Sequence, residues 1–190
     1  MTDKDNGTYT EDGAPEAENG QGAGTTPSSV AEGAKGAKGA EGAEGAEGAL
    51  FEPLIIAFAC NWCSYSGADL AGTSRYQYPP NMRIVRVMCS GRVDPSLVLK
   101  ALRGGADGVL VTGCHPQDCH YQSGNDKAQS RVAFMRRFLP QVGLDARRLR
   151  LEWIAGSEGE RFAHVANEFI DTVRSLGPNP VKGDDLPEVR

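Results

Sequence analysis

Four short apolar runs limit the possible folds of this chain more than any other feature. A stretch with helical spacing or a polar loop separates each run from the next. The first run, LIIAFA, has no polar position, which is typical of a strand buried on both faces of a sheet. Strands that alternate with helices specify a parallel sheet with helices on both faces. We therefore predict an α/β fold with a four-stranded parallel sheet in the flavodoxin-like order 2-1-3-4. The predicted strands are residues 54–59, 82–88, 108–113 and 149–154.

The stretches between these runs carry signals for helix boundaries. Asp94 and Pro95 are typical of an N-cap and a first helical residue. Ser157 and Glu160 have the spacing of a capping box, which predicts the start of the last helix. The predicted helices are residues 66–74, 95–103, 126–139 and the stretch from Ser157 to the residue before Pro178.

The first fifty residues differ from the rest of the chain. They hold 11 of the 24 glycines, a single β-branched aliphatic residue (Val30), and ten acidic against three basic side chains. Such a segment cannot bury enough apolar surface to offset its ordering entropy, so we expect residues 1–50 to form a disordered extension. Its glycine repeat at 33–49 contains no proline, which favours a flexible tether over a collagen-like helix. Residues 51–177 then form one α/β domain, followed by a loose tail at 178–190.

Composition and missing motifs exclude several classes of function. Residues 51–190 carry 15 acidic and 17 basic side chains, a balance that gives no case for nucleic-acid binding. No run approaches the ~20 apolar residues of a membrane helix, and the N-terminus lacks the regions of a signal peptide, so we expect a cytoplasmic protein. No GxGxxG or GxxxxGK(S/T) motif follows a predicted strand, and no Ser-His-Asp set is apparent. The domain therefore lacks the parts for nucleotide or hydrolytic chemistry of its own.

All five cysteines of the chain follow predicted strands. Cys60 and Cys63 come after the first strand, Cys89 after the second, and Cys114 and Cys119 after the third. The carboxyl ends of parallel strands lie at one edge of a sheet, and in the predicted order these three strands are neighbours about 4.8 Å apart. The sequence therefore predicts that five thiols converge on one small region.

The cysteine pattern allows several kinds of site. Each cysteine alone has a second interpretation as a small buried hydrophobe. A CxxC alone suits a redox dithiol, a zinc site or an iron–sulfur cluster, and in a reducing compartment structural disulfides are rare. Thiolate-rich ligation from three loops favours a metal centre. A structural zinc typically stabilises a small module that has no core of its own. This domain already has a core, so zinc has little to stabilise. Iron–sulfur clusters take four thiolates and need a rigid frame, which strand ends supply.

Several polar residues flank the predicted centre. Arg92 lies close to Cys89 in the stretch CSGR, where its positive charge would favour a reduced, anionic cluster; the alternative is a surface ion pair with Asp94. His115 and His120 each neighbour a cysteine. They suit hydrogen bonding to the centre, or a role as protonatable surface groups, better than direct ligation, because histidine-ligated clusters use two histidines at other spacings.

At these residues the chain resembles a known family, the delta subunit of methyl-viologen-reducing hydrogenase, the iron–sulfur subunit associated with heterodisulfide reductase. The resemblance covers residues 54–176 and implies a [2Fe-2S] cluster on four of the five cysteines. It further implies a relay of electrons from a hydrogenase, formate dehydrogenase or NAD(P)H-oxidising partner to the flavin-bearing subunit of a heterodisulfide reductase, with no catalysis by this chain alone. The stretches that carry it are CNWCSYSGAD, RVMCSGRVDP, GADGVLVTGCHPQDCHYQSGN and RLRLEWIAGSEGERFA.

The chain departs from that family pattern in two places. The extension at 1–50 is not part of the pattern, and Gln117 stands where a glycine is expected, which bears on the loop between Cys114 and Cys119. From the residues alone, a zinc-bound interaction module and a dithiol oxidoreductase using Cys60 and Cys63 remain the alternatives to the electron carrier.

Overall fold

The computed structural model of the chain describes residues 51–182. The expectation of a disordered extension at 1–50, and the part of the predicted tail at 183–190, lie outside the described residues.

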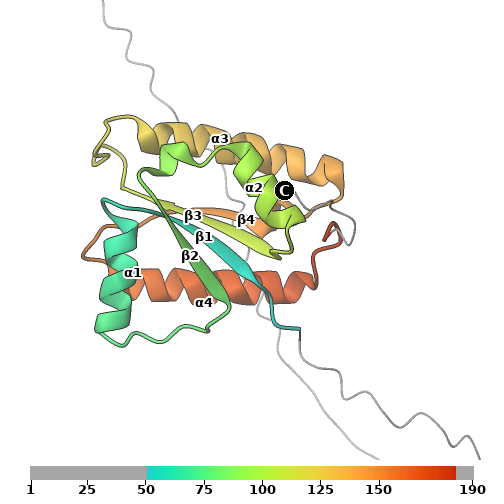
Figure 1. Cartoon of the computed structure of the whole chain (residues 1–190), viewed down its shortest axis with the longest axis horizontal. Helices are drawn as coiled ribbons and strands as arrows, with labels where there is room; N and C mark the ends of the chain where they lie inside the picture. The colour runs from blue at the N-terminus through green and yellow to red at the C-terminus, as the bar shows by residue number, and fades with distance from the viewer. Residues whose placement is uncertain (1–50, 183–190) are drawn as a thin grey trace, which may run out of the picture. The chain divides into compact units, whose positions relative to one another are not determined.

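A four-stranded sheet forms the centre of the domain, and all of its strands run parallel (Figure 1). The order β2-β1-β3-β4 confirms the predicted 2-1-3-4 arrangement. The parallel register places Cys60, at the end of β1, beside Val87 at the end of β2. The loops that leave these strand ends are therefore neighbours. The strands are β1 (Ile55–Cys60), β2 (Met82–Val87), β3 (Gly108–Gly113) and β4 (Leu149–Trp153).

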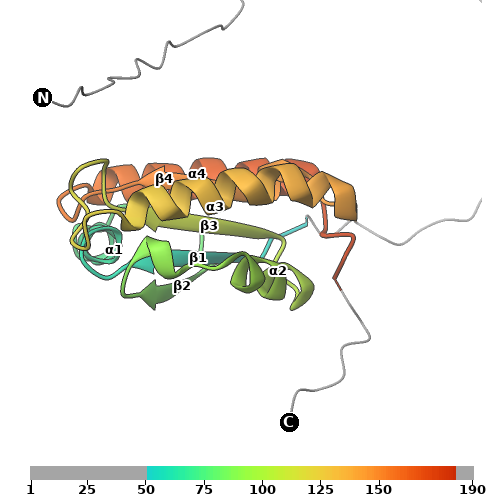
Figure 2. The ribbon, with the colours of Figure 1, turned by 90° about the horizontal axis from the view of Figure 1, so that it is seen from above.

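Helices cover both faces of the sheet, as predicted. One face packs against α1 and α4, and the other packs against α2 and α3 (Figures 1 and 2). Short 3-10 turns connect several elements. The helices are α1 (Ser64–Thr73), α2 (Pro95–Arg103), α3 (Gly124–Phe138) and α4 (Gly159–Leu176), and the turns are η1 (Ser90–Arg92), η2 (Leu139–Val142) and η3 (Ala146–Arg148).

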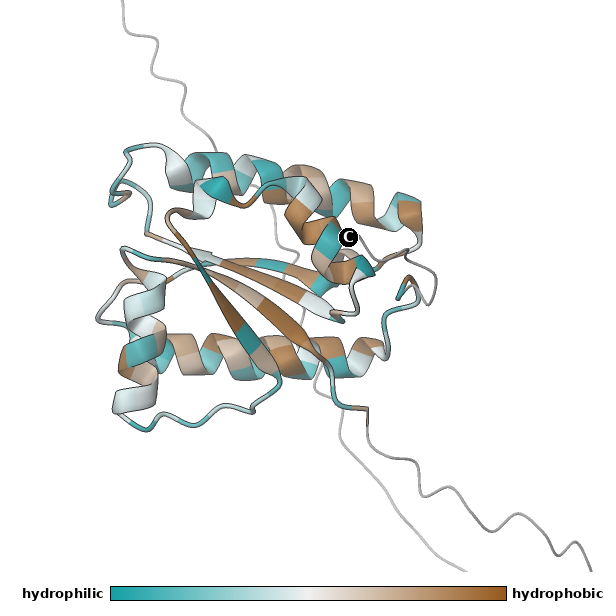
Figure 3. Cartoon of the chain, in the orientation of Figure 1, coloured by the Kyte–Doolittle hydropathy of each residue, from teal (hydrophilic) through white to brown (hydrophobic). Residues whose placement is uncertain are grey.

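The two central strands carry most of the core. All six residues of β3 are buried, which is why Thr112 is its one polar side chain, and Figure 3 shows the hydrophobic colouring concentrated along the strands. Leu110 and Phe162 lie in the cluster beneath α4, while Val111 and Met135 lie in the cluster beneath α3. Burying one such side chain fully contributes about 1.5–3 kcal/mol, so the strand ends are anchored on both faces.

Helix boundaries show where the sequence signals succeeded and failed. Asp94 caps α2 as predicted, because its carboxylate accepts a hydrogen bond from the Ser96 amide at 3.0 Å. The predicted capping box of Ser157 and Glu160 is wrong. The N-cap of α4 is Glu158, and its side chain makes no capping bond to the helix. That carboxylate instead accepts a hydrogen bond from the Ala155 amide at 2.6 Å, so it organises the loop before the helix.

A buried polar network closes the end of the sheet opposite the cysteines. The Asn179 amide donates to the Asp107 carboxylate at 3.0 Å, and its side chain donates to the carbonyls of Leu102 and Ala106 at 2.8 Å. The Arg148 guanidinium donates to the carbonyl of Asp107 at 2.9 Å. The first residues of the predicted tail therefore pack against the domain instead of trailing from it.

Among residues 51–182, no helix combines the length and the apolar character needed to cross a membrane.

Candidate metal centre

The sulfurs of all five cysteines are buried at the carboxyl end of the sheet. Cys60 is the last residue of β1 and Cys63 is the N-cap of α1, so Cys60 ends the strand rather than following it. Cys89 follows β2 as the N-cap of η1, Cys114 follows β3, and Cys119 lies in the loop before α3. None of the five forms a disulfide, and each is less than a tenth exposed. Figure 2 shows the loops after β1 and β3 at the same end of the domain.

Three of the sulfurs form one compact group. The Sγ atoms of Cys60, Cys63 and Cys114 all lie within 4.8 Å of one another, and those of Cys60 and Cys114 are 3.9 Å apart. Distances of this size suit three thiolates around one metal centre. The CxxC and the cysteine after β3 therefore meet as the strand order predicted.

Cys89 and Cys119 form a second group beside Gly124, the first residue of α3. The Gly124 amide donates a hydrogen bond to Cys119 Sγ at 3.2 Å. A β-carbon built on Gly124 would overlap the Cys89 sulfur and lie 3.0 Å from the Cys119 sulfur. Both sulfurs therefore share the space that a side chain at position 124 would fill.

The charge state of Cys60 is strongly biased toward the thiolate. The Cys63 thiol donates a hydrogen bond to it, and together with the backbone N–H groups of Trp62 and Ser90 this lowers the pKa of Cys60 to about 5, against the effect of burial. The same hydrogen bond raises the pKa of Cys63 well above its ordinary value. A thiolate that is already ionised near neutral pH is a ready ligand for a soft metal ion.

Backbone N–H groups also point at the other sulfurs. Burial works to raise the pKa of Cys119, but the amides of Tyr121, Asn125 and Gly124 more than offset it, so its pKa lies below the ordinary value. Burial raises the pKa of Cys89 and that of Cys114. These N–H donors stabilise negative charge on sulfur, and such hydrogen bonds tune iron–sulfur centres in general.

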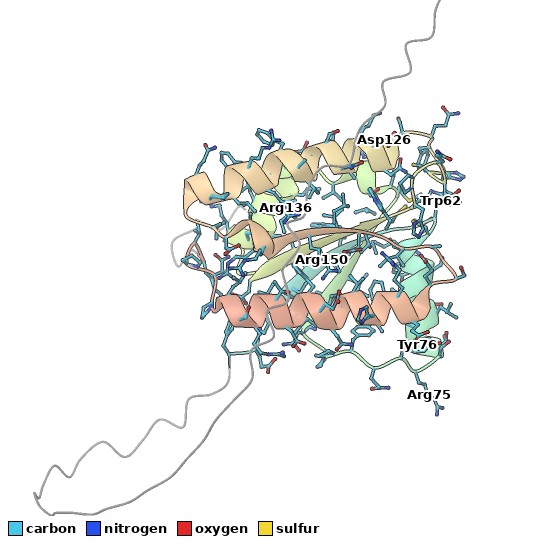
Figure 4. All side chains as sticks on the ribbon, turned by 180° about the vertical axis from the view of Figure 1, so that it is seen from behind. Trp62, Arg75, Tyr76, Asp126, Arg136 and Arg150 are labelled. Carbon is cyan, nitrogen blue, oxygen red and sulfur yellow. The ribbon has the colours of Figure 1, made fainter. Side chains whose placement is uncertain are left out.

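Aromatic side chains wall the site toward solvent. The rings of Trp62 and His120 stack with their centroids 3.8 Å apart, and the Trp62 indole N–H donates to the Tyr121 hydroxyl at 3.3 Å. Trp62 and Tyr121 are each about half exposed. Figure 4 shows Trp62 and Asp126, from the first turn of α3, at the same end of the domain.

His115 and Arg92 occupy the two flanks of the thiol site. His115 Nε2 lies 2.7 Å from a Glu158 carboxylate oxygen, so that ring nitrogen already has a partner. Arg92 lines a cavity of 320 Å³ together with Cys89 and Lys127. No ion pair joins Arg92 to Asp94 in the part of the chain that the structure describes, so the alternative interpretation of Arg92 gains no support.

Sequence reasoning missed the buried polar contacts behind the CxxC. The Ser64 hydroxyl accepts a hydrogen bond from the Cys60 amide at 2.9 Å and another from the Thr112 hydroxyl at 2.9 Å. This chain of bonds ties the end of β1 to the start of α1 and to β3. The signal was present, because a serine directly after a CxxC and a threonine within an otherwise apolar strand are both polar residues at buried positions.

The site has the properties of a thiolate metal centre. It offers soft sulfur donors from three rigid strand ends, N–H groups directed at those sulfurs, and a glycine that leaves room beside two of them. A hydrophobic core alone would not need N–H donors aimed at its cysteines. The donor set therefore fits an iron–sulfur cluster, and it also fits zinc.

Comparison with known proteins gives a family for this arrangement. A profile of the family described as methyl-viologen-reducing hydrogenase, delta subunit, matches residues 55–177. The chain is similar to the iron-sulfur subunit of the vhc F420-non-reducing hydrogenase of Methanococcus voltae, with 52% identity over 132 residues that cover 70% of this chain and 92% of the relative. It is 54% identical over 128 residues to the iron-sulfur subunit of the F420-non-reducing hydrogenase of Archaeoglobus profundus, which covers 67% of this chain and 93% of that relative.

A third relative is much longer than this chain. It is a subunit of the Ferredoxin/F(420)H(2)-dependent CoB-CoM heterodisulfide reductase of Methanosarcina acetivorans, and it is 52% identical over 126 residues, which cover 66% of this chain but 16% of the relative. The profile match and the identities agree with the resemblance that the sequence motifs indicated. The chain belongs to the methyl-viologen-reducing hydrogenase delta subunit family.

Proposed function

We propose that the thiol site holds a [2Fe-2S] cluster on four of the five cysteines and that the protein is an electron-transfer subunit. The observation that carries this proposal is the convergence of five buried sulfurs, three of them mutually within 4.8 Å, at one end of a rigid parallel sheet. When bound, such a cluster supplies one-electron redox chemistry, and the residues of this chain hold it and set its electrostatic surroundings.

Each part of the site has a defined role in this proposal. Cys60, Cys63 and Cys114 supply three ligands, and Cys89 or Cys119 supplies the fourth. The backbone N–H groups at Ser90 and Gly124 hydrogen-bond to ligand sulfurs and favour the reduced state. Arg92 adds positive charge beside Cys89 in the same sense. The aromatic wall around Trp62 keeps bulk water from one side of the centre.

The names of the relatives support a relay between two larger subunits. Two relatives are called hydrogenase iron-sulfur subunits, and a third carries the matching region as one part of a longer heterodisulfide reductase chain. We infer that this chain passes electrons from a hydrogenase, formate dehydrogenase or NAD(P)H-oxidising partner to the flavin-bearing subunit of a heterodisulfide reductase. Five free thiols fit a reducing compartment, so we place this work in the cytoplasm.

One observation favours a second candidate, a dithiol oxidoreductase. Cys60 has a pKa lowered to about 5 and receives a hydrogen bond from Cys63, which is the arrangement of an attacking thiolate and its resolving thiol. This candidate gives no role to Cys89, Cys114 or Cys119. A Cys114→Ser variant should leave dithiol chemistry intact but should disturb a metal centre.

Metal and sulfide analysis of protein prepared without oxygen tests the proposal. The electron-carrier function predicts about two irons and two acid-labile sulfides per chain and an EPR signal on reduction. One zinc per chain with no sulfide would replace it with the structural zinc module. Metal-free protein with a reversible disulfide between Cys60 and Cys63 would replace it with the oxidoreductase.

A further inference from the structure

Two glycines bring the loop after β2 against the start of α3. A β-carbon built on Gly91 would lie 2.7 Å from the carbonyl oxygen and 2.9 Å from the α-carbon of Gly124, closer than real β-carbons approach other atoms. The two backbones therefore touch at this point. This contact holds the turn η1, which follows Cys89, against the first residue of α3, which follows Cys119 in the chain.

Backbone angles do not explain why residue 124 is a glycine. Its φ is not among the positive values, which in the described glycines occur at Gly105, Gly143 and Gly177. Glycine is also a weaker helix former than alanine, so helix propensity does not explain a glycine at the first residue of α3. The requirement is one of volume, because the space of its missing side chain contains the sulfurs of Cys89 and Cys119.

We propose that Gly124 is a positioning residue of the thiol site, the group of five cysteines at the carboxyl end of the sheet. Its missing β-carbon lets the sulfurs of Cys89 and Cys119 pack against the first turn of α3, and its N–H group holds the Cys119 sulfur in place. This inference rests on the proposed metal-binding function. In this inference the start of α3 positions the sulfurs of Cys89 and Cys119. The ends of β1 and β3 position the other three sulfurs, those of Cys60, Cys63 and Cys114.

The test compares three variants of the full chain. Gly124→Ala fills the shared space, Gly91→Ala separates the two backbones, and Gly72→Ala is the control, because Gly72 lies within α1 and a β-carbon added there would meet nothing within 4 Å. Iron and sulfide content and the EPR spectrum are measured after anaerobic reconstitution. Alkylation of Cys89 by iodoacetamide in the metal-free proteins, followed by peptide mapping, gives a readout that does not depend on a cluster.

We expect Gly72→Ala to match the wild type in iron and sulfide content, in the EPR spectrum and in the rate of Cys89 alkylation. Gly124→Ala should lose most of its iron or shift its EPR spectrum, and its metal-free form should be alkylated at Cys89 several-fold faster, since that side chain, now 6% exposed, must leave its place. Gly91→Ala should change the same measurements in the same direction. Wild-type iron, EPR and alkylation rate in Gly124→Ala would overturn the inference while leaving the proposed function intact.

A double variant covers the case in which Gly124→Ala folds poorly. Cys89→Ala removes the sulfur that the new methyl group meets, so Gly124→Ala should destabilise the Cys89→Ala protein less than it destabilises the wild type. An equal loss of unfolding free energy in both backgrounds would show that the sulfur is not what occupies the space. If the wild type holds no iron, the proposed function fails, and the alkylation rates alone then uphold or overturn the role of Gly124.

Discussion

Replacing Gln117 with glycine should stabilise the protein, even though no contact is gained. Gln117 has a φ of 74°, in the left-handed region that favours glycine. It is the third residue of a tight turn in which the Asp118 amide donates to the His115 carbonyl at 3.1 Å and Pro116 is the second residue. A turn with proline at the second position and positive φ at the third takes glycine there by preference. This geometry gives the physical reason why a glycine is expected at position 117.

The magnitude follows from two opposing terms. A left-handed conformation costs an ordinary L-residue about 1–2 kcal/mol, and glycine avoids that cost. Glycine also makes the unfolded chain more flexible, and this entropy lowers the free energy of unfolding by about 0.5–1 kcal/mol. The Gln117 side chain is exposed and makes no hydrogen bond to the described residues, so its removal costs no contact. The net expectation is an increase of about 0.5–1 kcal/mol in the free energy of unfolding, or ~2–4 °C in Tm for a domain of this size.

Urea unfolding of the metal-free protein, followed by tryptophan fluorescence, measures this change directly. The matched control is Gln129→Gly, an exposed glutamine within α3, where glycine should cost about 1 kcal/mol. The two substitutions are chemically identical, and we expect them to change the stability with opposite signs. A destabilised Gln117→Gly protein would refute the interpretation of this turn as strained.

Three further predictions concern the surroundings of the thiols. The Glu158 carboxylate accepts hydrogen bonds from the Ala155 amide and from His115, and these bonds lower the pKa of Glu158 below 4.5. The carboxylate therefore stabilises the folded protein above pH 4.5, and this stabilisation is lost as the pH falls through the lowered pKa of the folded state. Glu158→Gln should therefore cost under about 1 kcal/mol at pH 7 and flatten the loss of stability below pH 4.5, as followed by urea titrations at several pH values. Asn125→Ala should cost about 1–3 kcal/mol in urea unfolding, because the buried side chain donates to the His115 carbonyl at 2.9 Å; a change below a few tenths would contradict this. Cys60→Ser should abolish cluster incorporation as measured by EPR, and retention of the wild-type signal would remove Cys60 from the ligand set.

The sequence was sufficient for the sheet because its signals are local and strong. The runs at 82–88 and 108–113 have no competing interpretation at their length, and the alternation of strands with helices left one common strand order. That order alone placed the five cysteines at one end. The start of α4 was not predictable in the same way, since Glu158 is committed to Ala155 and His115, and contacts between loops override a local capping pattern.

The division of the thiols into two groups could not be read from the sequence. Spacing gives the strand end at which each cysteine lies, but not the direction of its side chain, which depends on the turn η1 and on the first residue of α3. Gly124 carried no visible signal, because a glycine before a helix has several ordinary explanations. Its contact with the sulfurs of Cys89 and Cys119 appears only when the loop after β2 and the start of α3 are placed side by side.

Iron K-edge X-ray absorption of protein isolated without oxygen tests most directly whether cysteines from three separate loops bind iron at one end of the sheet. We expect a first shell of sulfur alone, about four per iron, with a second iron as the next heavy neighbour. A first shell of nitrogen and oxygen, or protein that contains no iron, would contradict this central claim.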